Sequence, residues 1–523
     1  MADSHAAPIE TTPTSDPPSE AKDARPRPGS RKPPVPPPLP ALPTYARSTY
    51  LFGRALGAVF LIAFVSLHVQ LEGLIGERGI APAHDLLEVL RQRQLGVSDF
   101  PSLLFLFGAD DASLHAVAIL GELASLALLL GVLEGPAALV ATIAYLSLHS
   151  FGGPFLSFQW DTLLIETGFV AALLLAWRPF HSPRALREPS AFARWALYLL
   201  LFRLVFLSGV VKLASGDPTW RQLDALDYHY WTQPLPNPLS FFAHQLPGPI
   251  QSASTLTVLA LELGLPFAIF LGVRGRRAAF LGITTLMILI QLTGNYGFFN
   301  LLTVAIALPL VDDAAWGKRT KRMLTPTLEA HPLWRERVRL ALIPIALLLA
   351  LLGALQIASS LGGAPHIPES LGAITDRVRP FRFVNGYGLF AVMTTERREI
   401  VIEGSLDGRE WREYPFRDKP RDPRELPRWS APHMPRLDWQ MWFAALGDFG
   451  DSPWLLRFMR RLLEGQPGVL DLLADDPFDG HPPRFVRARV YDYRFGDMAH
   501  LEATGEYWIV TDEGAYGPTL RAE

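Results

Sequence analysis

One uncharged run, from Ala278 to Val311, reads AAFLGITTLMILIQLTGNYGFFNLLTVAIALPLV. About 20 consecutive apolar residues cross a bilayer as a helix, so this run is long enough for two crossings. Its only clear interruption is the GNYG sequence at 294–297, because glycine and asparagine are typical of turns. The run therefore predicts two membrane helices joined by a tight turn.

Apolar runs of this kind recur along much of the chain. Hydrophobic residues make up 49% of the 523 residues and charged residues only 19%, whereas soluble chains carry roughly 25% charged residues. We expect about nine membrane spans, with seven or eight as alternatives. The predicted spans are residues 51–71, 113–133, 136–152, 155–177, 192–213, 251–272, 278–294, 296–311 and 339–358.

The loops between the predicted spans indicate their orientation. Lys and Arg concentrate in short cytoplasmic loops of membrane proteins. Nine spans place three basic loops, near Arg184, Arg276 and Lys321, in the cytoplasm together with the N-terminus. The two longest predicted loops and everything after Ser360 then lie on the opposite side of the membrane.

The two ends of the chain differ in composition from the spans. Residues 1–48 are polar and rich in proline, and such a segment cannot bury enough apolar surface to fold, so we expect a disordered cytoplasmic tail. Residues 49–360 form the predicted transmembrane domain, and residues 361–523 a soluble, exported α+β domain with a β-sheet core. The predicted fold class is a mostly α polytopic membrane bundle followed by this smaller domain.

Strand patterns are frequent in the predicted soluble domain. Five segments alternate or are rich in β-branched and aromatic residues, as strands are: 381–394, 399–403, 411–416, 485–495 and 507–511. Asp407-Gly408 lies between the second and third segments and is a typical hairpin turn. Residues 453–463 instead carry apolar side chains at helical spacing and predict an amphipathic helix.

Polar side chains within the predicted spans are the first candidates for a functional site, because ionisable groups are costly at membrane depth. This intramembrane polar cluster comprises Gln159, Asp161, Glu166, Arg203, Lys212, Glu262 and Asn295. If the spans 155–177 and 192–213 are antiparallel neighbours, their charges can form two ion pairs. These pairs would join Glu166 to Arg203 and Asp161 to Lys212. We interpret the cluster first as paired charges that hold helices together, and second as groups that carry chemistry.

A second set of candidates lies in the predicted soluble domain. Trp439 and Trp442 stand at helical spacing, which favours core packing, but exposed aromatic residues of this kind are anchors of protein interfaces. The candidate protein-binding residues are Tyr387, Arg436, Asp438, Trp439 and Trp442.

Several classes of function find no support in the sequence. The chain has no cysteine, which excludes disulfides, thiolate catalysis and cysteine-bound metals. A net charge of −3 offers no electrostatic footprint for nucleic acid. The sequence contains no P-loop, no dinucleotide fingerprint and no Gly-x-Ser-x-Gly elbow, and its histidines lack a metal-binding spacing. We therefore expect no cofactor, no metal and no nucleic-acid partner.

Six long segments, taken in order, resemble the lipase maturation factor family. They are FLSFQWDTLLIETGF (155–169), SGVVKLASGDPTW (208–220), LDYHYWTQPLPNP (226–238), TGNYGFFNLLT (293–303), YGLFAVMTTERREIVIEGS (387–405) and PRLDWQMWFAAL (435–446). The resemblance covers the chain from about residue 50 to its end. It implies a multi-pass membrane protein, in animals of the endoplasmic reticulum, that assists the folding and assembly of secreted homodimeric lipases. It also implies that clients bind the C-terminal domain, and it transfers no catalytic residues.

Two functions follow as hypotheses. The first is a non-enzymatic maturation factor whose partners are the lipid bilayer and exported client proteins such as lipases. The alternative is an integral-membrane enzyme that acts on a lipid or quinone-like substrate at the Asp161, Glu166, Arg203 and Lys212 cluster. The chain has 42 Arg and 6 Lys, which is typical of a GC-rich genome and indicates a bacterial member; its location would then be the cytoplasmic membrane.

Overall fold

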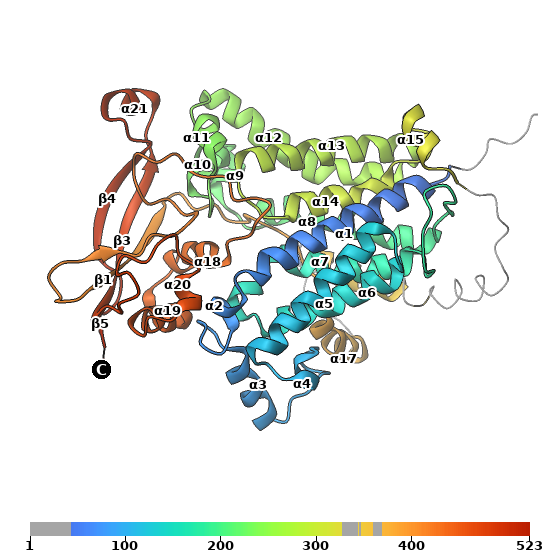
Figure 1. The fold of residues 1–523 in the computed structure, drawn as a ribbon. Coiled ribbons are helices and arrows are strands. Elements are labelled where there is room, and N and C mark those ends of the chain that lie inside the picture. The colour runs from blue at the N-terminus through green and yellow to red at the C-terminus, as the bar shows by residue number, and fades with distance from the viewer. Residues whose placement is uncertain (1–42, 327–343, 345–346, 359–368, 523) are drawn as a thin grey trace, which may run out of the picture. The chain divides into compact units, whose positions relative to one another are not determined.

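Long apolar helices account for most of the chain between residues 43 and 326 (Figure 1). The computed structural model describes residues 43–326, 344, 347–358 and 369–522. Within these residues five helical segments are long and apolar enough to cross a membrane: α1 (Ala46–His68), α5 (Asp111–Leu130), α8 (Ala191–Ala214), α12 with the 3-10 turn η2 (Gly248–Phe270) and α13 (Gly272–Thr293). The mostly helical membrane fold that the composition predicts is therefore present.

Shorter helices pack among these five segments. They are α6 (Glu134–Phe151), α7 (Gln159–Leu174) and α14 (Phe299–Ala307). Helix α1 packs on α5, α5 on α6, and α6 on α7. Helices α13 and α14 also pack against each other, and the GNYG sequence at 294–297 forms the turn between them, as predicted.

Local sequence signals set the ends of these helices. Asp110 caps α5, because its carboxylate accepts a hydrogen bond from the backbone N–H of Ser113 at 2.7 Å. Gly131 ends the same helix at a φ of +80°, in the left-handed conformation that glycine adopts without strain. Only residues 131–133 separate α5 from α6, so the two helices run antiparallel.

Helices occupy all of the predicted spans that lie within the described residues. By length and composition five segments qualify as crossings, so the expected number of about nine stays a prediction. The predicted span 339–358 lies partly outside the described residues, and its described part contains the apolar helix Leu347–Ala358. Most of the predicted proline-rich tail and the predicted domain boundary at residue 360 also lie outside them.

The three basic loops of the sequence come together in the structure. The backbone N–H of Tyr45, just before α1, donates to Glu188 at 2.8 Å, and the Tyr45 hydroxyl accepts from Arg276 at 2.8 Å. Asp313 accepts the backbone N–H of Arg47 at 2.9 Å. All three loops therefore meet at the start of α1.

A small antiparallel sheet forms the core of the C-terminal part. Its strands are β1 (Arg398–Ser405), β2 (Arg412–Glu413), β3 (Phe485–Phe495), β4 (Trp508–Ala515) and β5 (Leu520–Arg521). Their order is β2-β1-β3-β4, and β5 pairs with the start of β3. Helix α18 (Arg436–Ala445) packs against β1, and α19 (Pro453–Leu463) packs against β3. The described residues from 43 onward form one compact unit.

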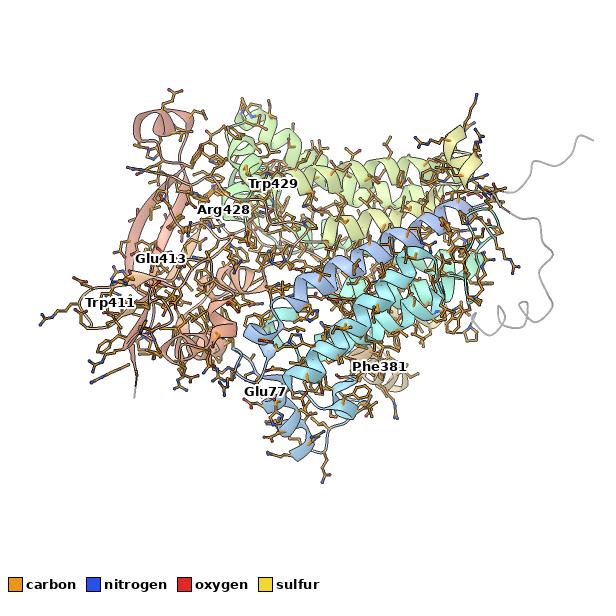
Figure 2. The ribbon with its side chains drawn as sticks, viewed as in Figure 1. Glu77, Phe381, Trp411, Glu413, Arg428 and Trp429 are labelled. Carbon is orange, nitrogen blue, oxygen red and sulfur yellow. The ribbon has the colours of Figure 1, made fainter. Side chains whose placement is uncertain are left out.

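Two of the predicted elements match the structure from end to end, and one is wrong. Strand β3 and helix α19 have the predicted boundaries. The predicted strand 381–394 is not a strand, and Phe381 lies beside the helices and away from the sheet (Figure 2). Phe383 packs instead on Phe169 of α7, and side chains of α7 bond the backbone N–H groups of Asn385 and Gly388 in place of a neighbouring strand. The predicted strand 411–416 is reduced to β2.

Candidate functional site

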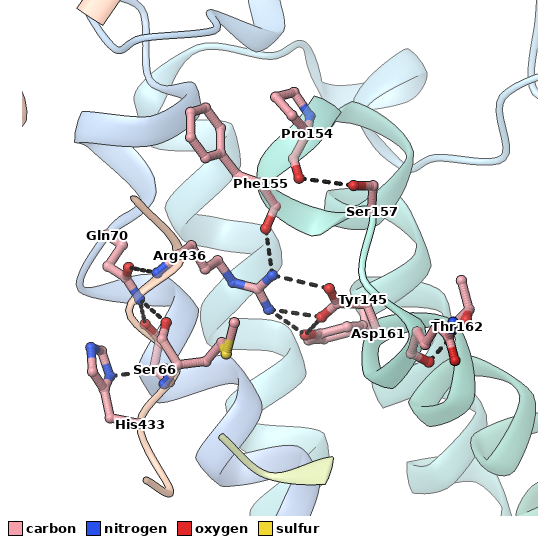
Figure 3. A network of polar contacts seen from close by, with 12 residues as sticks. Ser66, Gln70, Tyr145, Pro154, Phe155, Ser157, Asp161, Thr162, His433 and Arg436 are labelled. Carbon is pink, nitrogen blue, oxygen red and sulfur yellow. Dashed lines mark hydrogen bonds and ion pairs between the residues drawn. The ribbon is translucent and has the colours of Figure 1, made fainter. Parts of the chain in front are cut away.

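Arg436, the first residue of α18, reaches from the C-terminal part into the helix bundle (Figure 3). Its side chain is fully buried. The guanidinium forms a bidentate ion pair with Asp161 at the start of α7, with Nη2–Oδ1 at 2.8 Å and Nη1–Oδ2 at 3.0 Å. It also donates to the Phe155 carbonyl at 2.6 Å. Two parallel charge-assisted hydrogen bonds fix both the distance and the angle between the two groups.

Tyr145 of α6 completes this buried pair. Its hydroxyl donates to Asp161 Oδ1 at 2.6 Å and accepts from Arg436 Nη2 at 3.0 Å. The adjacent carboxylate raises the pKa of Arg436 despite the burial of the guanidinium, so this residue keeps its charge. A buried charge pair is more stable when its remaining donors and acceptors are satisfied. Tyr145 and the Phe155 carbonyl satisfy the two Nη groups of Arg436, whereas its buried Nε has no hydrogen-bond partner among the described residues.

Side chains of α1 and the following turn hold the backbone that precedes Arg436. Gln70 accepts the Arg436 backbone N–H at 2.9 Å and donates to the Met434 carbonyl at 2.9 Å. The Ser66 hydroxyl accepts the Met434 N–H and lies 2.9 Å from Nδ1 of His433. Burial lowers the pKa of His433, so its neutral ring can accept the Ser66 proton. The entry of α18 into the bundle is thus fixed through backbone and side chain alike.

Glu166, in the middle of α7, forms a second contact with the C-terminal part. Its Oε1 pairs with Arg203 of α8. Its Oε2 accepts three hydrogen bonds, from the Tyr387 hydroxyl at 2.7 Å and from the backbone and side-chain nitrogens of Asn385 at 3.0 Å each. One carboxylate therefore joins two helices to the segment that leads into the sheet.

The same segment runs antiparallel along α7. Phe383 packs on Phe169 with ring centroids 4.6 Å apart. Five residues later Gly388 exchanges two hydrogen bonds with the Gln159 side chain, at 2.9 and 3.2 Å. Irregular backbone beside membrane helices must be satisfied by protein groups, and Glu166 and Gln159 supply them.

Asn295 lies in the GNYG turn between α13 and α14 and joins three segments. Its side-chain amide donates to the carbonyls of Pro236 at 3.1 Å and Arg428 at 2.8 Å. Its carbonyl accepts the backbone N–H groups of Ser430 at 3.0 Å and Ala431 at 3.2 Å. All four hydrogen-bonding positions of its side chain are used, three of them to attach the C-terminal part to this turn and one to hold Pro236.

Lys212 and Glu262 form a separate ion pair between α8 and α12, at 2.8 Å. The Lys212 ammonium also donates to the Ser208 carbonyl at 3.1 Å. Both side chains line a cavity of about 400 Å³. This pair shares no residue with the Arg436 or Glu166 contacts.

The structure thus divides the predicted intramembrane polar cluster into distinct contacts. The predicted pair of Glu166 and Arg203 is present. The predicted pair of Asp161 and Lys212 is wrong, because Asp161 bonds to Arg436 and Lys212 to Glu262. Lys212 faces α12, whereas the start of α7 is covered by α18. Arg436 stands at the start of a helix with two tryptophans and a methionine, but no local signal there identifies Asp161 as its partner.

The five candidate protein-binding residues are buried: Tyr387, Arg436, Asp438, Trp439 and Trp442. Trp439 packs edge-on against Trp160 with ring centroids 4.7 Å apart, and the Trp442 ring N–H donates to the Thr232 carbonyl at 2.8 Å. Their helical spacing therefore indicates core packing. A role of these residues in binding partners stays a prediction.

Asp438 is a buried acid on the same helix. Its Oδ1 accepts the backbone N–H groups of Asp418 at 2.8 Å and Lys419 at 3.1 Å. Burial, together with the nearby Asp418 carboxylate, raises the pKa of Asp438 to about 7. This group therefore titrates near neutral pH.

Taken together, these contacts hold the C-terminal part against the membrane helices. Glu166, Asp161 and Glu262 each lie against a cation. Within the described ranges no group of three or more His, Cys, Asp or Glu side chains could hold a metal ion. The arrangement can position segments relative to one another, through contacts that link residues far apart in the chain.

Known proteins resemble the chain over nearly its whole length. Residues 46–318 match the lipase maturation factor transmembrane domain, and residues 383–518 match the lipase maturation factor C-terminal domain. Lipase maturation factor 2 of Gallus gallus is 34% identical over 570 aligned residues, which cover 88% of this chain and 79% of the relative. The human lipase maturation factor 2 is also 34% identical, over 88% of this chain and 80% of its own length.

A second group of relatives gives the same result. Lipase maturation factor 1 of Bos taurus is 34% identical over 501 aligned residues, covering 89% of this chain and 88% of the relative. No solved structure gives a significant match. Because both domains match in order and the similarity extends over most of each protein, the chain belongs to the lipase maturation factor family.

Proposed function

We propose that this protein is a membrane-bound maturation factor that assists exported lipases. The observation that supports this function is the match of both domains to proteins named lipase maturation factors. The apolar helices anchor the protein in a membrane. The comparisons do not favour the alternative of a membrane enzyme at the intramembrane polar cluster.

The proposal includes an orientation with about nine spans, a cytoplasmic N-terminus and an exported C-terminal domain. Contacts at the two ends of the helices support it. The basic loops meet at Tyr45, at the start of α1. The opposite ends, at the start of α7 and the turn after α13, contact residues 428–436 of the C-terminal part. This orientation requires the basic loops and the sheet to lie at opposite ends of the helices.

Reporter fusions test this orientation. We expect a reporter that is active only outside the cytoplasm to work when fused after Glu523 and to fail when inserted at Arg184. The expected membrane is the endoplasmic reticulum in a eukaryotic cell and the cytoplasmic membrane in a bacterium. A reporter after Glu523 that is active only in the cytoplasm would overturn the orientation.

We further propose that clients bind along the outer edge of β4. Among the described strands, β4 pairs on one side only, with β3. Residues 511–513 of this strand are exposed. A free strand edge can pair with an extended client segment through backbone hydrogen bonds, with little demand on the client's sequence. That property suits a factor that meets incompletely folded chains.

The edge of β1, by contrast, is covered. Its Ile402 carbonyl accepts the backbone N–H of Tyr414 at 2.8 Å, and its Ile400 carbonyl accepts from the Lys419 ammonium at 2.9 Å. These contacts occupy the groups that a client strand would need. Of these two strands, β4 is therefore the one available for strand addition.

Site-specific photo-crosslinking in the full-length protein tests this surface. A photoreactive residue at Thr511 of β4 should crosslink to a co-expressed secreted lipase. The matched control places the same residue at Glu88 of α3 (Ala83–Gln92), which is exposed on a segment that the proposed orientation puts on the same side. Equal crosslinking at both positions, or crosslinking at Glu88 alone, would contradict binding at β4. Failure of the lipase to gain activity on co-expression would contradict the proposed function itself.

A further inference from the structure

The cavity beside Lys212 lies among α8, α12, α13, α14 and the short helix α10 (Ala225–Thr232). Its volume of about 400 Å³ falls within the roughly 300–1,000 Å³ that small-molecule pockets occupy. None of its lining residues belongs to the Arg436 or Glu166 contacts. It borders the joint between the bundle and the C-terminal part, because Leu389 and Phe390 also line it.

The cavity has a polar end and an apolar end. On α8 the lining changes from Leu204 to Lys212 toward the end of the helix, and on α13 from Leu286 to Thr293. The turn after α13 then contributes Tyr296, whose hydroxyl lies 3.1 Å from Nε2 of His229 of α10. The charged pair and the aromatic hydroxyl groups thus lie near α10, and the rest of the lining is mostly apolar, with a few serine and threonine side chains.

The polar end carries no net charge. Lys212 and Glu262 neutralise each other at 2.8 Å. Burial lowers the pKa of His229 to about 4, so its ring is neutral near pH 7. A ligand with an ionised head would therefore place an uncompensated charge in a buried site, which is costly.

One hydrogen-bond donor at this end has no protein partner. Tyr230 of α10 lines the cavity with only 8% of its surface exposed. Its hydroxyl forms no hydrogen bond within the part of the chain that the structure describes. A phenol hydroxyl can donate one hydrogen bond, so this group is available to a molecule that occupies the cavity.

The cavity opens toward an apolar surface. Leu246 and Leu289 line it and are exposed. Other side chains of α11 (Pro238–His244) and α13 are also apolar and exposed, namely Leu239, Phe242, Ile288 and Leu292. Leu289 belongs to α13, one of the apolar segments that qualify as membrane crossings, and Leu246 directly precedes another, Gly248–Phe270. In the proposed orientation the mouth therefore lies near one end of these two crossings.

We propose that this cavity binds an uncharged lipid with a single acyl chain and an oxygen-bearing head, the chemistry of a monoacylglycerol. The acyl chain enters between Leu246 and Leu289 and occupies the apolar depth. The head accepts a hydrogen bond from Tyr230. This site is independent of client binding at β4, so either proposal can fail without the other.

The test uses the full-length protein in nanodiscs and a monoacylglycerol probe that carries a diazirine and an alkyne. The probe should label peptides of α10 or α13, and unlabelled monooleoylglycerol should compete in a saturable manner. The fatty-acid probe of the same chain length, ionised at pH 8, should label at least about fivefold less. Equal labelling by the two probes would overturn the uncharged head, and labelling that does not saturate would overturn the site.

Variants connect the labelling to the cavity. Leu289→Trp places an indole at the mouth and should reduce labelling at least about fivefold. Leu281→Trp is the matched control, because Leu281 is 67% exposed on the same helix but does not line the cavity. Tyr230→Phe should weaken competition by monooleoylglycerol about three- to tenfold, the loss expected for one hydrogen bond. Unchanged labelling of Leu289→Trp, in protein with the wild-type unfolding temperature, would overturn the proposal.

Discussion

Arg436 and Asp161 form a buried bidentate ion pair although 275 residues separate them in the chain. One belongs to the helix that covers the sheet, and the other to a helix of the apolar bundle. A contact of this kind makes the stability of each part depend on the other.

Removing one member of this pair should destabilise the protein strongly. Arg436→Met leaves the Asp161 carboxylate buried without its cation, which typically costs about 3–5 kcal/mol. The double variant Arg436→Met with Asp161→Leu should regain part of that loss, because a buried pair can be replaced by apolar groups. The readout is the yield and unfolding temperature of detergent-solubilised protein.

The control for this cycle is Arg457→Met, which removes an exposed arginine of α19. It should leave both readouts near the wild-type values. Equal losses in the single and double variants would show that Arg436 acts alone and not through Asp161.

Glu166 should behave as a structural junction. Glu166→Ala leaves the Arg203 guanidinium without its anionic partner and also removes the hydrogen-bond acceptor for Asn385 and Tyr387. It should lower the abundance of folded protein more than the double variant that also replaces Arg203 by alanine. If the single and double variants were equally abundant and both failed to activate lipase, Glu166 would have a functional role beyond holding segments together.

Asp438 should make stability depend on pH. Its pKa is about 7 in the folded protein, against an unperturbed value of 3.8. Between these values the folded state binds one proton more than the unfolded state, so this group's contribution to stability falls as pH rises from about 4 to about 7. The slope is at most about 1.4 kcal/mol per pH unit.

Asp438→Asn isolates that effect, because the amide oxygen can still accept from Asp418 and Lys419 but does not titrate. The variant's stability should exceed that of the wild type by an amount that grows between pH 5 and pH 7 and levels off above pH 7. Unfolding temperatures at four pH values measure it. A constant difference across this range would refute the raised pKa.

The C-terminal part should fold poorly by itself. Cut from the bundle, residues 383–522 would expose Arg436, Trp439 and Tyr387, all buried in the full chain. We expect low soluble yield and weak tertiary signals in near-ultraviolet circular dichroism. A well-folded isolated fragment would show that the contacts with α1 and α7 are dispensable for this domain.

Features with local causes could be read from the sequence. Long apolar runs give the helices, the GNYG turn separates α13 from α14, and strict alternation gives β3 its full length. The pair of Glu166 and Arg203 followed from the order of residues on two adjacent helices. Each of these depends on chain segments that are close together in sequence.

Features that depend on contacts between distant segments could not be predicted from the sequence. Nothing near Asp161 indicates that its partner is Arg436, since periodicity carries no information across 275 residues. The segment 381–394 has the residue types of a strand, but α7 satisfies its polar groups, so tertiary contacts override its local preference. The sequence predicts Asp161 as the partner of Lys212, but the true partner is Glu262, because packing turns Lys212 toward α12.

The separation of Arg436 from Asp161 has a consequence for biosynthesis. Chains grow at about 5–20 residues per second, so Arg436 is made about 14–55 s after Asp161. Throughout that interval Tyr145, already synthesised, is the partner that can donate to the Asp161 carboxylate. Nascent chains that stop before α18 therefore keep an acid without its cation among apolar helices, a defect that the finished molecule does not have.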